Sequence, residues 1–439
     1  MAGQRTVGIG MGPSNLALAI ALVERSASQE CGEWTFLERN ETVQWHSNML
    51  LKGSRLQISF LKDLVTLRNP TSFYTFINYL KCRGRLDYFI NRGTFNASRD
   101  EFTDYLNWVH GNLPDHLSQM SRTVQQVEPV YGSDGEVAEL EVIYADRDGN
   151  EYRLRTDNLV VAVGGMPVIP GVFHNQLDEN IFHSSNFLSH IEKYKNHQGP
   201  LRIGVVGSGQ SAVEIIHYLN DHFPNSQIHS IFRKAAYKPA DNSPFVNEVF
   251  FPSMTGFMYG LADDNKRREV LSEYWQTNYA AVELDLLESL YEKLYADRVS
   301  GVQHIHIHSY TTIEGVHALD KGYRLVLSNV LSGDSDTMEL DAIILATGYE
   351  RTMLPPFMDK IIPNIQMDNG RLSIARDYTL QMTSSFKPRI YVQGMSQLTH
   401  GISDSLLSVL AVRSQEILES ILCGQSHGQE ASLSEEVLI

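Results

Sequence analysis

Residues 5–40 alternate short apolar runs with one longer amphipathic stretch, which predicts a strand, a glycine turn, a helix and a second strand. RTVGIGMGPSN leads into LALAIALVERS, and EWTFLERN closes the unit. Gly8 is expected to permit the tight turn, and Gly10 to let a pyrophosphate approach the backbone. Gly12 followed by Pro13 favours a helix start. The unit is therefore typical of a dinucleotide-binding fold.

The match to a strict GxGxxG pattern is imperfect, because its third glycine falls on Pro13. Glu38 strengthens the interpretation, since an acidic side chain at the end of the second strand can accept hydrogen bonds from both hydroxyls of an adenosine ribose. The alternative is an ordinary glycine turn followed by a surface glutamate.

A second strand, turn and helix follow in LRIGVVGSGQSAVEII, where Gly207, Gly209 and Ala212 form a GxGxxA pattern. The next strand ends in no acidic residue but in Arg233 and Lys234. Basic side chains pair with a ribose 2′-phosphate, which favours NADPH over NADH. The alternative for Arg233 is a solvated charge at a strand end.

The order of the two units implies that FAD binds the first and NADPH the second, so that a hydride can pass between them. We expect an α/β protein with two Rossmann-like dinucleotide-binding domains, one for FAD and one for NADPH, and a small, mainly helical substrate-binding region. The strand DAIILATGYE is expected to return the chain to the FAD domain. The expected divisions are an FAD domain over 1–170, an NADPH domain over 171–340 with the helical segment at about 240–295, a second FAD part over 341–423 and a flexible tail over 424–439.

Charge and composition exclude several classes of protein. The formal charge of −16 argues against nucleic acid as a partner, because no basic run compensates for it. No apolar run is long enough to span a membrane, and the first strand begins too early for a signal peptide, so we expect a cytoplasmic protein. Cys31, Cys82 and Cys423 are far apart, suit neither redox exchange nor metal binding, and are expected to be buried. No metal is expected.

Several further blocks share one pattern with a known family. They are GxGxGPSN at 8–15, QWHSNM at 44–49, LQISFLKDLVTLRNPTS at 56–72, SGQSAVE at 208–214, DNSPFVNEVF at 241–250, TNYAAVE at 277–283, DAIILATGY at 341–349 and THGISDSLLSVLAVR at 399–413. Together they cover nearly the whole chain. The sequence resembles the microbial N-hydroxylating flavoprotein monooxygenases of siderophore biosynthesis, the L-ornithine N5- and L-lysine N6-monooxygenases, and most closely the ornithine branch. Pro13 is usual in this family.

The resemblance implies a flavin reduced by NADPH and its reaction with O2 to a C4a-hydroperoxyflavin sheltered by retained NADP+. The neutral amine of a small amino acid would attack the distal oxygen, converting L-ornithine to N5-hydroxy-L-ornithine for a hydroxamate siderophore. A homo-oligomer, often a tetramer in such relatives, is also implied. No side chain is assigned as an obligatory acid or base, because the cofactor is the oxidant and the protein supplies position and charge.

The resemblance also assigns substrate-binding residues. Lys62 resembles the lysine that binds the substrate carboxylate and contacts cofactor, with a surface lysine paired to Asp63 as the alternative. Asn247 resembles a ligand of the amino-acid head group, and Asn278 a ligand of the NADP ribose and the substrate backbone. Both lie between apolar neighbours and should have fixed hydrogen-bond partners, although either could instead cap a helix. Ser408 completes the set.

The flavin contacts are expected from three segments. Trp45, His46 and Met49 resemble the loop that wraps the isoalloxazine ring, where His46 would pack and hydrogen-bond, and Gln57 resembles a polar group of the same pocket. The last long helix is expected to start after Ser403, whose hydroxyl can cap it, and to point its positive end at the flavin, although a plain core helix fits equally well. The residues expected to bind FAD are Gly8, Gly10, Gly12, Pro13, Ser14, Glu38, Gln44, Trp45, His46, Met49, Gln57, Leu406 and Leu407. The residues expected to bind NADP are Gly207, Ser208, Gly209, Gln210, Ser211, Arg233 and Asn278.

Other functions remain open. The same chemistry on L-lysine, putrescine or cadaverine is the nearest alternative, because one methylene is worth only about 1–3 kcal/mol of discrimination. Baeyer–Villiger and other flavin monooxygenases share the architecture, and a non-catalytic redox sensor would share the cofactors. Disulfide reductases need a redox cysteine pair, which this chain lacks.

Overall fold

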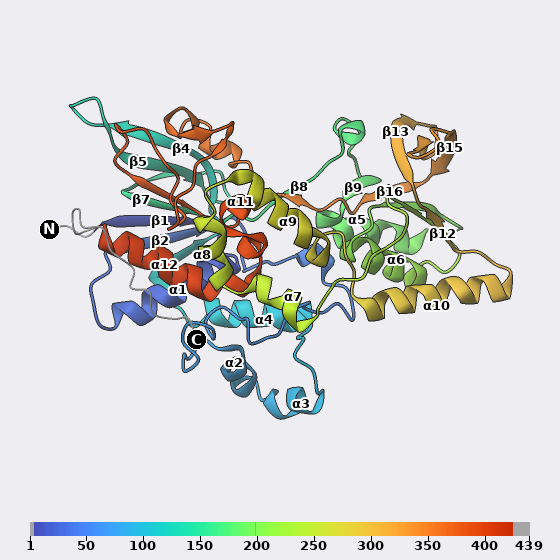
Figure 1. Ribbon diagram of the computed structural model, residues 1–439, viewed down its shortest axis with the longest axis horizontal. Helices are drawn as coiled ribbons and strands as arrows, with labels where there is room; N and C mark the ends of the chain where they lie inside the picture. The colour runs from blue at the N-terminus through green and yellow to red at the C-terminus, as the bar shows by residue number, and fades with distance from the viewer. Residues whose placement is uncertain (1–3, 198, 425–439) are drawn as a thin grey trace.

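The computed structural model describes residues 4–197 and 199–424, and it contains two five-stranded parallel sheets that lie side by side (Figure 1). Each sheet is covered by helices on one face and by a three-stranded antiparallel sheet on the other. The expected α/β fold with two Rossmann-like domains is confirmed. The tail expected over 424–439 lies, apart from Gly424, outside the described residues.

The first sheet has the strand order β20-β7-β1-β2-β3, and all of its strand pairs are parallel. Every residue of β7 is buried, as a central strand covered on both faces requires. Helices α1, α4 and α12 pack on one face, and the sheet β4-β5-β6 packs on the other. The bounds are β1 Arg5–Ile9, β2 Glu33–Glu38, β3 Ser118–Met120, β4 Thr123–Tyr131, β5 Val137–Ala145, β6 Glu151–Thr156, β7 Asn158–Val161, β20 Arg389–Val392, α1 Pro13–Ser26, α2 Phe76–Cys82, α3 Leu86–Asn91, α4 Arg99–His110 and α12 Leu410–Cys423.

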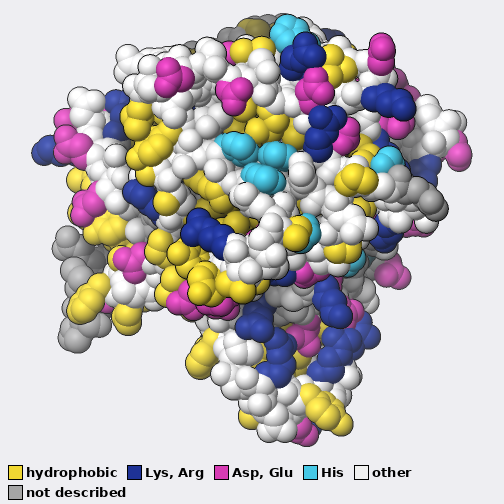
Figure 2. Space-filling model, turned by 90° about the vertical axis from the view of Figure 1, so that its right-hand side faces the viewer, with side chains coloured by type: hydrophobic (Ala, Val, Ile, Leu, Met, Phe, Trp, Pro, Cys, Tyr) yellow, Lys and Arg dark blue, Asp and Glu magenta, His cyan; other side chains and the backbone are white. Residues whose placement is uncertain are grey.

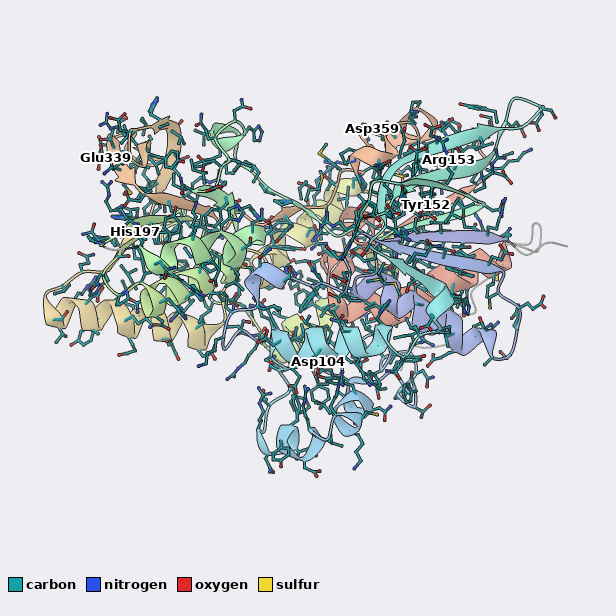
Figure 3. All side chains as sticks on the ribbon, turned by 180° about the vertical axis from the view of Figure 1, so that it is seen from behind. Asp104, Tyr152, Arg153, His197, Glu339 and Asp359 are labelled. Carbon is teal, nitrogen blue, oxygen red and sulfur yellow. The ribbon has the colours of Figure 1, made fainter. Side chains whose placement is uncertain are left out.

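The second sheet repeats this plan with the parallel order β12-β11-β10-β16-β9. Helices α6 and α10 cover one face, and the sheet β13-β14-β15 covers the other. Figure 3 shows both antiparallel sheets on the same side of the molecule, with Tyr152 and Arg153 on β6 and Glu339 on β15. The bounds are β9 Ile181–His183, β10 Arg202–Val206, β11 Gln227–Ile231, β12 Ile305–His308, β13 Thr311–Ala318, β14 Tyr323–Asn329, β15 Ser335–Leu340, β16 Ala342–Leu345, α6 Gln210–His222 and α10 Leu284–Ser300.

The strand expected to return the chain to the FAD domain lies in the second sheet instead. β16 pairs with β10 and β9, so a division between residues 340 and 341 cuts through this sheet. All four residues of β16 are buried. Such an apolar run suits the centre of either parallel sheet, so the sequence does not reveal which one it joins. The chain crosses afterwards, where β17 (Tyr349–Glu350) pairs with β8 (Met166–Pro167).

The segment expected at about 240–295 is mainly helical and bridges the two domains. α8 and α9 pack against α11 and the 3-10 turn η9 of the first domain, whereas α10 packs on α6 of the second (Figure 1). The bounds are α7 Pro244–Asn247, η6 Glu248–Phe250, α8 Ser253–Gly260, α9 Asp264–Asn278, α11 Gln397–His400, η9 Ile402–Ser405 and η10 Leu407–Val409.

Helices α2 and α3 project from the first domain. Lys and Arg side chains gather on this narrow part of the molecule (Figure 2). Several of them are paired with α4, since Arg85 lies 2.9 Å from Asp104 and Arg92 lies 3.4 Å from Glu101. The projection is therefore not a surface of uncompensated positive charge.

Only one of the three cysteines is buried as expected. Cys31 is buried, whereas Cys82 and Cys423 are exposed. The two exposed residues are the last residues of α2 and α12, and helix ends reach the surface. The expectation of burial is wrong for these two.

The last long helix begins at Leu410, not after Ser403 as expected. The turns η9 and η10 precede it, and Leu406 separates them in an extended conformation, with φ −107° and ψ 162°. The Ser403 hydroxyl is buried and has no hydrogen-bond partner among the described residues, so it does not cap the helix. The cause is tertiary, because the Asp404 carbonyl accepts a hydrogen bond from Arg413.

A buried ion pair fixes the interruption between η9 and the helix α12. The Arg413 and Asp404 side chains are 1% and 0% exposed, and Nη1 of Arg413 lies 3.1 Å from Oδ1 of Asp404. Nη2 of Arg413 donates to Ser14 Oγ at 3.1 Å, and Oδ2 of Asp404 accepts the Ser396 N–H at 2.7 Å. The pair thereby connects α12 to the first turn of α1 and to Ser396, the residue before α11.

We expect Asp404→Asn to destabilise the protein by about 3–5 kcal/mol, because it leaves the Arg413 charge buried without a counter-ion. Glu151→Gln is the control, since it removes an exposed pair with Arg153 whose side chains are 53% and 51% exposed, and it should cost less than about 1 kcal/mol. Thermal unfolding followed by circular dichroism measures both. Equal shifts of the midpoint would contradict the expectation.

Candidate active site

The three glycines of the first turn have different roles. Gly8 lies in β1, and a Cβ there would come 2.3 Å from the Phe36 ring. Gly10 has φ +87°, and its Cβ would come 2.6 Å from the Ala162 carbonyl oxygen. At Gly12, the N-cap of α1, no atom lies within 4 Å of the Cβ position. Gly10 therefore makes the tight turn expected of Gly8, and the open backbone expected at Gly10 lies at Gly12.

The first turn has the groups that a dinucleotide requires. α1 begins at Pro13, as predicted, so its positive N-terminal end faces the open side of Gly12. Glu38 ends β2 and is almost buried, and its carboxylate accepts the Met11 N–H at 2.8 Å and the Asn40 N–H at 2.9 Å. Its Oε1 also accepts from the Asn40 side-chain amide at 2.7 Å, so of the about four lone-pair sites of a carboxylate about one remains for a ribose hydroxyl.

The second turn is built like the first. Gly207 has φ +134°, and a Cβ there would come 2.3 Å from the Ala346 carbonyl oxygen. Gly209 is the N-cap of α6, and its Cβ position meets only the Ala280 Cα, at 3.5 Å. Ala212, in the first turn of α6, is fully buried. In each turn, a glycine with positive φ lies against a carbonyl, and a second glycine leaves the helix N-terminus open.

The basic residues after β11 differ in their surroundings. Arg233 is exposed and forms no ion pair within the described part of the chain. Lys234 Nζ donates to the Ala280 carbonyl at 3.4 Å, and burial lowers the pKa of this lysine. Arg233 is therefore the more available of the two cations to an external anion.

The polar residues at the start of α6 are only partly available to a ligand. Ser208 is buried and Ser211 is half-buried in the first turn. The Gln210 side chain donates to Glu214 Oε1 at 2.9 Å and accepts the Glu283 N–H at 2.9 Å. The backbone N–H of Gln210 and the second hydrogen of its side-chain amide remain for a phosphate.

A bidentate ion pair joins the two domains. Arg99, at the start of α4, donates to the two carboxylate oxygens of Glu214 in α6 at 2.7 and 2.8 Å. The two side chains are 13% and 5% exposed. Arg99 also donates to the Met49 carbonyl at 3.3 Å, and Glu214 also accepts from Gln210. The pair therefore links the predicted flavin loop to the first turn of the predicted NADP helix.

The predicted flavin loop is held by ring packing. The ring centroids of Trp45 and His46 lie 4.9 Å apart, and Trp45 also packs edge-on against Phe102 at 5.4 Å. The His46 ring lies 6.1 Å from that of Tyr349, and it forms no hydrogen bond within the described residues. The His46 ring therefore packs against protein neighbours, and its role toward a flavin stays a prediction.

Three other predicted flavin contacts differ in exposure. Met49 is buried. Gln44 is exposed, and its Oε1 accepts from the Ser47 hydroxyl at 3.3 Å. Gln57 is half-buried, and its amide has no hydrogen bond among the described residues, so that it is available to a ligand.

Lys62 is half-buried and is not paired with Asp63. The Asp63 carboxylate is buried and accepts three backbone N–H groups at 2.6 to 2.9 Å. The Lys62 Nζ instead lies 5.8 Å from the centroid of the Phe251 ring, in the helical segment, and burial lowers its pKa. A partly desolvated ammonium without an anion is suited to bind a ligand carboxylate.

The two predicted asparagines have different environments. Asn247 Nδ2 donates to the Asn242 carbonyl at 3.0 Å, so the expected fixed partner is present. Asn278 is the last residue of α9, and its amide has no hydrogen bond to the described residues, so the same expectation is wrong there. Neither side chain caps a helix.

Tyr279, next to Asn278, ties the helical segment to the loop before η10. Its hydroxyl lies 2.7 Å from Ser405 Oγ and accepts from Gln397 Nε2 at 2.9 Å. Burial raises the pKa of this hydroxyl, so it stays protonated at neutral pH. This contact brings the segment of Asn278 close to Leu406, as we expect if both residues belong to one binding site.

Three buried hydroxyls near this loop have no partner among the described residues. They belong to Ser396, Ser403 and Ser408. Leu406 and Leu407 are partly exposed beside them. An unsatisfied buried hydroxyl costs about 1–3 kcal/mol, so three in one stretch indicate a partner that is not part of the chain.

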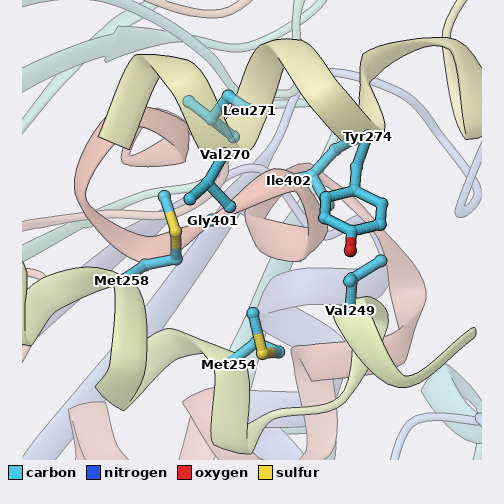
Figure 4. Close-up of a pocket in the computed structure, with 8 residues that line it drawn as sticks. All are labelled: Val249, Met254, Met258, Val270, Leu271, Tyr274, Gly401 and Ile402. Atoms are coloured by element: carbon cyan, nitrogen blue, oxygen red, sulfur yellow. The ribbon is translucent and has the colours of Figure 1, made fainter. Parts of the chain in front are cut away.

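A small apolar cavity lies between α8, α9 and η9 (Figure 4). Its volume is about 10 Å³, which is room for one water at most. It is therefore not the site of an amino acid. Its lining is Val249, Met254, Met258, Val270, Leu271, Tyr274, Gly401 and Ile402.

These features fit two dinucleotides. The open helix cap at Gly12 and the carboxylate of Glu38 suit FAD, and the open cap at Gly209 and the exposed Arg233 suit NADPH. The sequence did not single out Arg99, Glu214 or Tyr279. No local signal could pair Arg99 with Glu214, because 115 positions separate them.

Comparison with known proteins agrees with this site. The family described as L-lysine 6-monooxygenase/L-ornithine 5-monooxygenase matches residues 5–351. The chain is 45% identical to the L-ornithine N(5)-monooxygenase of Pseudomonas aeruginosa over 417 residues, 94% of this chain and 93% of that protein. Its fold matches the ornithine hydroxylase from Pseudomonas aeruginosa with a TM-score of 0.89 and 44% identity, over 95% of this chain and 98% of that one. It also matches the Kutzneria sp. 744 ornithine N-hydroxylase with reduced FAD, NADP+ and L-ornithine, with a TM-score of 0.90 and 33% identity, over 97% and 100% of the two chains. The chain therefore belongs to the L-lysine 6-monooxygenase/L-ornithine 5-monooxygenase family.

Proposed function

We propose that this protein is an L-ornithine N5-monooxygenase that uses FAD, NADPH and O2 to form N5-hydroxy-L-ornithine for a hydroxamate siderophore. The observation that carries the proposal is the half-buried Lys62, which has no anion partner among the described residues and lies against Phe251. Family membership and the two linked dinucleotide turns support it.

The chain's own residues would hold both cofactors. Gly12 and the start of α1 would bind the FAD pyrophosphate, and Glu38 its adenosine ribose. Gly209 would bind the NADPH pyrophosphate, and Arg233 the 2′-phosphate. Bound FAD, once reduced by NADPH, supplies the chemistry with O2.

The substrate would lie between the helical segment and the loop before η10. Lys62 would hold the carboxylate, and Asn247 the amino-acid head group. Asn278, whose amide is free of other partners within the described chain, would bind the substrate backbone and the NADP ribose, and Ser408 would donate from its buried hydroxyl. Fixing both ends of a short amino acid places its side-chain amine, which is the protein's main contribution to the rate.

We also propose that the protein acts in the cytoplasm, where NADPH is supplied, and that it is a homo-oligomer, a tetramer by family resemblance. Among the described residues, no helix is both long and apolar enough to span a bilayer.

The direct test is product formation by FAD-loaded protein with NADPH and O2, comparing L-ornithine, L-lysine, putrescine and cadaverine. We expect kcat/KM for ornithine to exceed that for lysine by about 10- to 200-fold, since one methylene separates them. A preference for lysine or a diamine would overturn the substrate assignment. NADPH oxidation without a hydroxylated amine from any of the four would overturn the monooxygenase itself.

Lys62→Ala should raise KM for ornithine by about 10- to 100-fold, because a charge-assisted hydrogen bond is worth about 1.5–3 kcal/mol. Turnover of putrescine, which has no carboxylate, should change little. Lys52→Ala is the control, because Lys52 is exposed. An equal loss with both substrates would show that Lys62 serves the cofactor and not the carboxylate.

Glu214→Gln should slow anaerobic flavin reduction by NADPH by about tenfold or more, since a displacement of about 1 Å can cost about 100-fold in rate. Product per NADPH should fall, while the FAD content stays unchanged. Glu416→Gln is the matched control, because Glu416 forms a bidentate pair with Arg376, at 3.0 and 2.7 Å, inside the first domain. Stopped-flow absorbance measures the rates, and the same rate in both variants would refute the role of Glu214.

A further inference from the structure

The outer face of α10 carries an apolar stripe that is exposed to solvent. The inner face packs on the second domain through Leu286, Leu287, Leu290 and Leu294. The exposed side chains of the outer face are Leu284 at 56%, Tyr291 at 64%, Tyr295 at 58%, Val299 at 72% and Val302, just beyond the helix, at 54%. α10 runs to the outer end of this domain (Figure 1), where hydrophobic side chains are visible among the charged ones (Figure 2). Single exposed apolar residues are ordinary, but a row of four along one helix marks an interaction surface.

The stripe has the spacing of a coiled-coil seam. Its positions alternate steps of four and three residues, as a heptad pattern requires. The seam positions on the helix are Leu284, Glu288, Tyr291, Tyr295 and Arg298, with Val299 beside them. α10 ends at Ser300 and Gly301 has φ +74°, so Val302 lies beyond this spacing. Glu288 and Arg298 form no ion pair within the described residues, although both are exposed.

A second copy of α10 completes this seam when it runs antiparallel about a two-fold axis. Tyr291 then faces the partner's Tyr295 at the centre of the seam. In a two-fold symmetric interface, each such contact occurs twice. The central tyrosine layers of the two copies therefore match.

The charges select this orientation. In the antiparallel pair, Glu288 of each copy faces the partner's Arg298. In a parallel pair, Glu288 would face the partner's Glu288 and Arg298 the partner's Arg298, and like charges at a partly desolvated seam repel. Polar residues at seam positions commonly specify orientation in this way.

We propose that α10 is a self-association surface on which a second copy of this chain docks antiparallel about a two-fold axis. The helix has 17 residues. Its length of about 25 Å limits the contact area, so we expect association in the micromolar range. The inference does not depend on the substrate or on catalysis.

Sedimentation velocity of the FAD-loaded protein, at concentrations below and above the micromolar range, tests the proposal. Glu288→Arg should weaken this association at least about tenfold, because it places two like charges together at each end of the seam. Arg298→Glu should do the same, and the double variant Glu288→Arg with Arg298→Glu should restore it. If the chain also associates through another surface, the single variants should remove one two-fold step and leave the other.

Glu269→Arg is the control, because Glu269 is exposed on α9 and the charge change is the same. Flavin content and circular dichroism show that each variant is folded. Wild-type protein that stays monomeric at every concentration would overturn the proposal. So would single variants that associate like wild type, or a double variant that does not recover.

Discussion

The relative position of the two domains is the constraint on which the candidate site depends. A hydride passes between two cofactors only when the reacting atoms are nearly in contact, and here the two dinucleotide turns belong to separate sheets. Arg99 and Glu214 join these sheets through two short hydrogen bonds. A buried ion pair contributes little net stability, but its geometry is specific. Because Arg99 also holds the Met49 carbonyl and Glu214 also holds Gln210, the same pair orients the flavin loop and the NADP helix.

The two glycine turns, at Gly10 and at Gly207, have the same geometry. In each, a glycine with positive φ closes against the carbonyl of a residue just after a neighbouring parallel strand, Ala162 after β7 and Ala346 after β16. The next glycine caps the helix and leaves its N–H groups open to a phosphate. The segments around Ala162 and Ala346 therefore form the back of each candidate nucleotide site, and the second belongs to the stretch that the sequence suggests as a domain connection. A side chain at Gly10 or Gly207 would push the two strands apart.

The sequence predicts local units well, because strand, turn and helix signals lie within a few residues of one another. Both βαβ units, the helical segment and the family follow from such signals and are confirmed. The start of α12 could not be predicted, since Arg413 reaches back to the Asp404 carbonyl and breaks the helix. β16 is apolar enough for either sheet, and its position depends on its neighbours. The separate roles of Gly8, Gly10 and Gly12 depend on what faces each Cβ position, which only the folded structure reveals.

The central claim is that NADPH bound at the second turn reduces a flavin bound at the first. Anaerobic mixing of FAD-loaded protein with NADPH or NADH tests it most directly, with the absorbance of the oxidised flavin as the signal. We expect rapid bleaching with NADPH and much slower bleaching with NADH, because we propose that the exposed Arg233 pairs with the 2′-phosphate. Bound flavin that NADPH does not bleach would contradict the account.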